Sequence, residues 1–187
     1  PIDLDDLSRT IEKAIEEIEF IRKSQQEHSQ LESIKSDLAV AGEIQQAILP
    51  RNFPPIPEFS EKVDLYATMT PAKEVGGDFF DFFKIDDRRV GFVIADVSGK
   101  GVPASIFMAV SRTLLRATGM RGISTNECLD TVNHMLCHER VDSMFVTIFY
   151  GIYDIETGEI EYTNAGHNPP YIVHADGKVE PLPLSEN

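Results

Sequence analysis

Two stretches decide the fold: VGGDFFD at residues 75–81 and ADVSGKG at residues 95–101. Each sets an aspartate, Asp78 or Asp96, beside glycines at the edge of a strongly apolar segment. The residues between them include the turn pair Asp86-Asp87, which predicts a β-hairpin with the two aspartates on neighbouring strands. Hard divalent cations prefer carboxylate ligands, so the pair indicates a metal site. Aspartate beside glycine is also ordinary turn chemistry, and this alternative stays open.

The composition is that of a soluble globular protein, with 187 residues of which 42% are hydrophobic and 26% charged. A net charge of −14 argues against nucleic acid or an anionic membrane as the main partner. We recognise no signal peptide and no apolar run near the ~20 residues that span a membrane. We therefore expect no membrane insertion. The cysteines Cys128 and Cys137 lie nine residues apart on one expected helix, too far for a disulfide, so we expect reduced thiols and a cytoplasmic location.

Residues 1–49 are expected to form one long helix, because their only glycine is Gly42 and their only proline is the first residue. Apolar residues recur at three- and four-residue intervals, with a polar interruption at residues 25–28, which is typical of a coiled coil containing a stammer. We expect a parallel dimer through residues 4–48; the alternative is an amphipathic helix lying on its own domain. The seam comprises Leu4, Leu7, Ile11, Ala14, Ile18, Ile21, Leu31, Ile34, Leu38, Ala41, Gln45 and Ile48.

Four prolines between Pro50 and Pro57 end this helix and form a stiff connector. We place the helix at 1–49, the proline-rich connector at 50–61 and the domain at 62–187. An order of three strands, two helices and four strands predicts an α+β fold with antiparallel sheets. The expected strands are 63–69, 79–85, 90–95, 144–153, 159–163, 171–174 and 178–182, and the expected helices are 101–119 and 124–138.

Two further motifs accompany the aspartate stretches: EIQQAILP at residues 43–50 and NAGHNPP at residues 164–170. In this order, the motifs resemble those of bacterial SpoIIE-type serine/threonine phosphatase domains, which include regulators of stress-response sigma factors. These domains belong to the metal-dependent type-2C (PPM) phosphatase superfamily, and the resemblance covers residues from about 40 to 187. It implies an α-β-β-α sandwich of two stacked antiparallel sheets flanked by helix pairs, preceded here by the coiled-coil helix.

The resemblance also implies a hydrolase that uses two Mn²⁺ or Mg²⁺ ions. Asp96 matches the aspartate that bridges both ions, Asp78 matches one that binds a single ion, and the backbone carbonyl of Val97 matches a further ligand. These residues are therefore the candidate metal ligands, and the two aspartates are the candidate catalytic residues. In such a site, hydroxide activated by the metal attacks phosphoserine in line.

Four more residues are candidates for supporting this site: Gly77, Asp81, Asn164 and His167. For Asp81, contact with a metal ligand and contact with a water molecule both remain open. His167 is interpreted chiefly as a hydrogen-bonding residue of its own loop, with general-acid catalysis as the alternative. Lys73 and Lys100 are either phosphate-facing or simply solvated.

The family carries two more metal-binding aspartates downstream, and this sequence ends at Asn187 before either. We therefore expect an incomplete phosphatase domain over residues 62–187, with weak or single-ion binding and little turnover by this chain alone.

The predicted function is a protein serine phosphatase that acts on a signalling protein of the anti-sigma-factor antagonist type. An upstream sensor would control it through the N-terminal helix. The alternative is a catalytically incomplete phosphatase-fold module for dimerisation and signalling. A diguanylate cyclase, suggested by GGDFF at residues 76–80, is disfavoured because Phe79 stands where that family needs an acid.

Overall fold

The computed structural model describes residues 4–71, 73–138 and 144–183. The chain divides into two compact units, one ending at Ala41 and the other beginning at Gly42. Helix α1 (Leu4–Ala47) runs through this boundary, so that its last turn belongs to the second unit. Within the described residues, no helix is long and apolar enough to cross a membrane.

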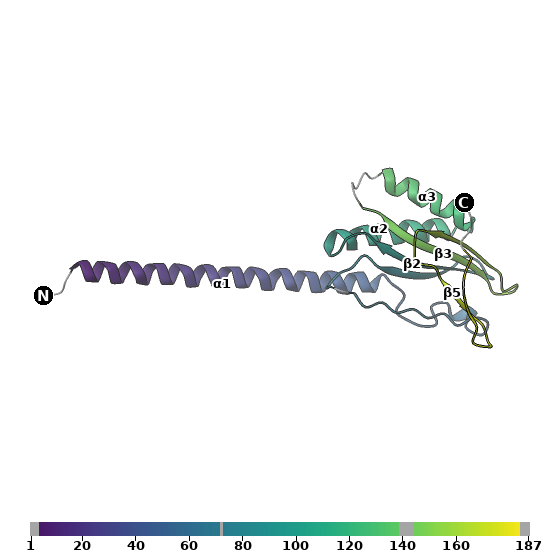
Figure 1. Cartoon of the computed structure of the whole chain (residues 1–187), viewed down its shortest axis with the longest axis horizontal. Helices are drawn as coiled ribbons and strands as arrows, with labels where there is room; N and C mark the ends of the chain where they lie inside the picture. The colour runs from purple at the N-terminus through teal and green to yellow at the C-terminus, as the bar shows by residue number, and fades with distance from the viewer. Residues whose placement is uncertain (1–3, 72, 139–143, 184–187) are drawn as a thin grey trace. The chain divides into compact units, whose positions relative to one another are not determined.

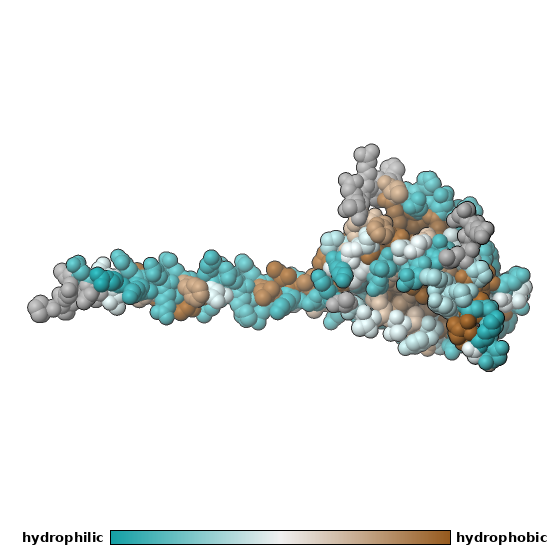
Figure 2. Space-filling view, in the orientation of Figure 1, coloured by the Kyte–Doolittle hydropathy of each residue, from teal (hydrophilic) through white to brown (hydrophobic). Residues whose placement is uncertain are grey.

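The first unit consists of the exposed part of helix α1, and the prediction of a long N-terminal helix is confirmed. Its large apolar side chains are open to solvent, and Figure 2 shows them as brown patches on a mostly hydrophilic helix. Several of these belong to the predicted seam: Ile11, Ile18, Ile21, Leu31 and Ile34, each 47–57% exposed.

The second unit contains a four-stranded antiparallel sheet in the order β1-β2-β3-β4. The strands are β1 (Phe79–Lys84), β2 (Arg89–Val97), β3 (Val146–Asp154) and β4 (Ile160–Ala165). Two short strands, β5 (Tyr171–Val173) and β6 (Val179–Pro181), form a separate antiparallel pair. Helices α2 (Val102–Gly119) and α3 (Thr125–His138) cover one face of the larger sheet (Figure 1). The prediction of an α+β fold with antiparallel sheets is confirmed.

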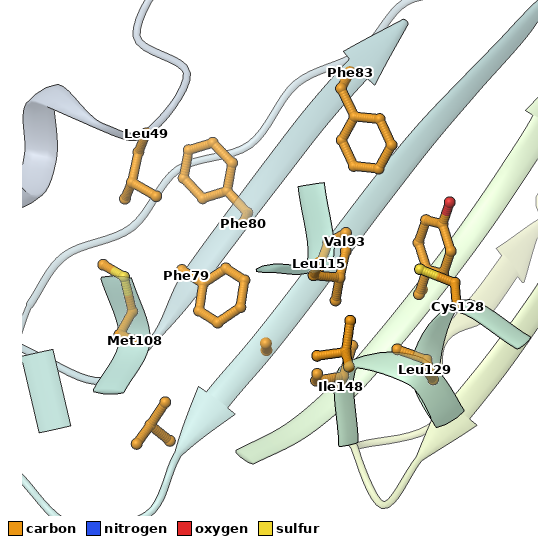
Figure 3. Packing of buried hydrophobic residues seen from close by; sticks show 14 of the residues in the cluster. Leu49, Phe79, Phe80, Phe83, Val93, Met108, Leu115, Cys128, Leu129 and Ile148 are labelled. Carbon is orange, nitrogen blue, oxygen red and sulfur yellow. The ribbon is translucent and has the colours of Figure 1, made fainter. Parts of the chain in front are cut away.

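The main core lies between this sheet face and the two helices. Phe79, Phe83 and Val93 of the hairpin pack there with Met108 and Leu115 of α2, as Figure 3 shows. Side chains alternate between the two faces of a strand, so the residues between these core positions point to the other face. The hairpin therefore carries two different surfaces, one buried under the helices and one on which Phe80 packs near Leu49 and at whose end Asp78 and Asp96 lie.

One predicted strand is wrong. Residues 63–69 alternate between half-buried and exposed side chains, as a strand would, but they form no ladder with any described residue. The alternation arises because Val63, Leu65 and Met69 pack against the two apolar clusters of the domain. Burial on one side of an extended segment gives the period of a strand without its hydrogen bonds.

Candidate metal site

The predicted β-hairpin forms, and it brings Asp78 and Asp96 together. Phe79 pairs with Ala95 across the ladder, so the residues just outside this pair, Asp78 and Asp96, are neighbours at the same end of the hairpin. Neither belongs to the set of alternate residues that faces α2. Burial and the adjacent Asp96 carboxyl group raise the pKa of Asp78, whereas the nearby His167 acts to lower it. The two carboxyl groups therefore crowd one another, a repulsion that a bound cation would relieve.

A pocket of about 450 Å³ opens at this pair. Its lining includes residues 75–78 and 96–101, which are most of the two stretches that open the sequence analysis. Lys73 and Lys100 also line it, so two cationic side chains share the pocket with two carboxyl groups. Such a set can attract both a divalent cation and an anionic group.

Gly77, which lies two residues before β1, allows the backbone to approach the end of β2 closely. A Cβ atom on Gly77 would lie 2.9 Å from both the carbonyl oxygen and the Cβ of Val97. Only glycine, which has no side chain, fits there. Because Gly77 has no Cβ, the Val97 carbonyl lies beside the backbone that leads into Asp78. Two carboxylates and a backbone carbonyl form an oxygen donor set that suits Mg²⁺ or Mn²⁺.

A glutamine that the sequence analysis placed in the helical seam supports the same loop. Gln45 is 5% exposed, and its amide makes two hydrogen bonds with the backbone of Gly76. The sequence signal for this role is a polar residue at an apolar seam position, just before the proline-rich connector.

The loop that contains Asn164 and His167 lies beside the pair. The Asn164 side chain closes this loop, because its Nδ2 donates to the His167 carbonyl (3.0 Å) and its Oδ1 accepts from the His167 N–H (2.8 Å). The His167 Nδ1 lies 3.0 Å from the hydroxyl of Thr147, and that hydroxyl also contacts the carbonyl oxygen of Asp96 (3.4 Å). Sequence reasoning missed Thr147, which has no motif and is located only by the pairing of β3 with β2.

Asp81 does not join the pair, which corrects the expectation that it contacts a metal ligand or a water there. It is 1% exposed, and it ion-pairs with Arg112 (3.0 Å) and Arg116 (2.8 Å) of α2. The reason is the strand period: three residues after Asp78, a side chain points to the opposite face of the sheet.

Among the residues that the structure describes, no group of three or more His, Cys, Asp or Glu side chains is arranged to hold a metal ion. The acidic side chains that meet at the pocket are the pair Asp78 and Asp96.

Solved structures share this architecture. The SiaA-PP2C domain of Pseudomonas aeruginosa matches with a TM-score of 0.58 at 18% identity, over 73% of this chain and 54% of that one. The RsbU and RsbW domains of Rv1364c from Mycobacterium tuberculosis match with a TM-score of 0.54 at 33% identity, over 62% of this chain and 32% of that one. The fold is therefore that of the PP2C-type phosphatase domains.

The sequence comparison assigns the chain to one family within this fold. The family described as stage II sporulation protein E (SpoIIE) matches residues 86–187, which is more than half of the chain, and the chain belongs to it. A relative in Bacillus subtilis (strain 168), phosphoserine phosphatase RsbU, is 34% identical over 151 residues, which cover 78% of this chain and 43% of RsbU. The chain thus spans less than half the length of this relative.

Proposed function

We propose that this chain is part of a metal-dependent protein serine phosphatase. The substrate is phosphoserine on a signalling protein of the anti-sigma-factor antagonist type, in the cytoplasm. The observation that carries the proposal is the convergence of Asp78 and Asp96 at one pocket that Lys73 and Lys100 also line. Its relative RsbU, named a phosphoserine phosphatase, supports the same chemistry.

Asp78, Asp96 and the Val97 carbonyl would hold Mn²⁺ or Mg²⁺, with two ions in the intact domain. The cation supplies Lewis-acid chemistry, lowering the pKa of water from 15.7 to about 7 so that hydroxide is available near neutral pH. The chain's own residues shape the rest: the lysines attract the phosphoryl group, and Gly77 keeps Val97 in reach.

His167 supports the loop in this proposal. Its backbone N–H and carbonyl both bond the Asn164 side chain, and its Nδ1 contacts Thr147, so that the described contacts of His167 hold the loop. If His167 only supports the loop, a His167→Gln variant should retain turnover. If the imidazole were the general acid, the same variant should lose turnover.

Manganese binding to this chain, followed by calorimetry, tests the site. We expect saturable binding that Asp78→Ala and Asp96→Ala each abolish. Asp64→Ala removes an exposed acid outside the pocket and serves as the matched control. Binding that persists in both site variants would reject the assignment.

Activity is tested on a phosphoserine protein with manganese, using the longer protein that contains the intact domain. Loss of a residue that merely supports a metal ligand costs about 10- to 100-fold, so removing a ligand by Asp96→Ala is expected to cost at least a hundredfold. Unchanged turnover in that variant would exclude a phosphatase that works through this pair.

The N-terminal helix is proposed to form a parallel dimer through residues 4–48 and to transmit the signal of an upstream sensor. The support is the set of exposed apolar seam residues from Ile11 to Ile34, because a coiled coil would bury these side chains. Ile18→Asp should shift the chain from dimer to monomer in sedimentation, whereas Glu17→Ala should not. A monomeric wild-type chain would contradict the proposal.

The second candidate function is a non-catalytic phosphatase-fold module for dimerisation and signalling. The exposed apolar seam residues of α1 favour this second function, because dimerisation through them needs no catalytic turnover. Dimerisation together with neither manganese binding nor turnover would select this function.

A further inference from the structure

A second polar pocket, of about 270 Å³, lies beside the end of α1. Three arginines line it: Arg51 from the connector, and Arg112 and Arg116 from α2. No acidic side chain is among the described residues of its lining, although the protein as a whole carries a net charge of −14. The pocket is therefore positively charged, although the chain as a whole is negatively charged.

The two helical arginines are held from one side by a single carboxylate. They lie four residues apart on α2, and so they project on the same face of the helix. Arg116 Nη1 donates to Asp81 Oδ1 (2.8 Å) and to the Phe82 carbonyl (3.1 Å), while Arg112 Nη2 lies 3.0 Å from Asp81 Oδ2. One carboxylate thus faces two guanidinium groups.

Arg51 is held by the backbone of helix α1. Its Nε donates to the Gln46 carbonyl (2.8 Å) and its Nη2 to the Glu43 carbonyl (3.0 Å). These bonds cap the end of the helix but bring no formal negative charge. The three arginines together therefore outnumber Asp81 by two positive charges.

One hydrogen-bond donor of the three arginines, the Nε of Arg112, is buried and has no acceptor among the described residues. The Arg112 side chain as a whole is 14% exposed. Buried donors are nearly always satisfied by the protein, a water or a ligand. An oxygen-rich anion in the adjoining pocket would supply the missing acceptor.

We propose that this pocket binds a small tetrahedral oxyanion of the phosphate class. Guanidinium groups match phosphate oxygens with paired N–H donors, and three of them converging suit a dianion better than a planar monoanion. The bound anion would link Arg51 of the connector to Arg112 and Arg116 of α2. This site is separate from the Asp78 pocket and does not depend on the proposed phosphatase activity.

Thermal unfolding of the chain in sodium phosphate tests the proposal, with sodium chloride at equal ionic strength as the reference. Phosphate should raise the unfolding temperature with saturation, because a ligand that binds only the folded state stabilises it. Arg51→Gln removes an exposed side chain and should weaken the apparent phosphate affinity about tenfold. Arg121→Gln, an exposed arginine outside the pocket, should leave it unchanged.

Arginine Nε–Hε signals in NMR spectra locate the binding. Phosphate should shift the signals of Arg51, Arg112 and Arg116, and it should do so equally in an Asp96→Ala chain. Backbone amide shifts confined to residues 96–101, unchanged Nε–Hε signals of the three arginines, an undiminished response in Arg51→Gln, or an equal response to acetate would each overturn the proposal. So would a phosphate titration that follows the chloride reference throughout.

Discussion

The Gln45 side chain closes a two-bond ring with the backbone of Gly76. Its Nε2 donates to the Gly76 carbonyl (2.6 Å), and its Oε1 accepts from the Gly76 N–H (2.9 Å). Gln45 belongs to the last turns of α1, and Gly76 lies two residues before Asp78. A displacement of the helix end would therefore reach the loop that presents Asp78.

Replacing Gln45 with alanine should destabilise the domain by about 1–3 kcal/mol, since it leaves a backbone donor and acceptor of Gly76 without partners. The measurement is urea unfolding, with faster hydrogen exchange of the Gly76 amide as the local readout. Gln46→Ala, at the exposed neighbouring position, should change neither quantity. Equal stability of the Gln45 variant and the wild type would show that these bonds contribute little.

The sequence predicted most of the fold because its signals were local. The apolar segments on either side of the Asp86-Asp87 turn predicted the hairpin. The wrong prediction of a strand at residues 63–69 arises because strand pairing is not a local property. A ladder depends on a neighbouring backbone, which the periodicity of one segment does not report.

The site was predictable to the extent that its residues form motifs. Asp78 and Asp96 stand beside glycines, and their meeting follows from hairpin pairing. Thr147 reaches His167 only through the pairing of distant strands, and Arg112 reaches Asp81 only through the packing of α2 on β1. Such contacts are fixed by tertiary structure, and no spacing in the sequence encodes them.

Gly77→Ala is expected to destabilise the domain by about 1–3 kcal/mol and to weaken manganese binding. The new Cβ would lie 2.9 Å from the Val97 carbonyl oxygen and 3.3 Å from the Ala104 Cβ, so that the Gly77 backbone must move away from the end of β2 and from α2. Urea unfolding and calorimetry measure the two effects. Gly76→Ala is the matched control, because among the described residues its Cβ would meet Pro71 alone, at an ordinary contact distance of 3.8 Å; comparable losses in both variants would refute the steric explanation.

Asp81→Asn should cost about 3–5 kcal/mol of unfolding free energy, because it leaves Arg112 and Arg116 without their buried counter-charge. Chemical denaturation measures this loss. The exposed Asp87, which pairs with Lys84 at the surface, provides the control Asp87→Asn with an expected change below about 1 kcal/mol. A loss of similar size in both variants would mean that burial of Asp81 is unimportant.

Stability should fall in acid partly through Asp154. Burial acts to raise its pKa, but hydrogen bonds from the Glu156 N–H, the Arg88 guanidinium and the Thr157 N–H hold the pKa of Asp154 below its ordinary value. The unfolded chain, with an aspartate pKa of about 3.9, therefore binds the proton more readily. The stabilisation is complete above that pKa and is lost as pH falls through the lower pKa of the folded state.

Unfolding free energies of the wild type and Asp154→Asn, measured from about pH 6 down to about pH 2, test this. The difference between the two proteins should be largest near pH 6 and should shrink in acid. A difference that is independent of pH would exclude Asp154 as a source of the acid sensitivity.

The hairpin carries Asp78 and Asp81 on opposite faces of one strand, and both depend on the same register. The turn fixes this register, because Asp86 Oδ1 accepts from the N–H groups of Arg88 and Arg89. A slip of one residue would turn Asp81 toward the pocket and Asp78 toward the apolar side of the sheet. A single-residue insertion in this strand would therefore misplace both aspartates at once, whereas a substitution of the exposed Asp87 would leave the register unchanged.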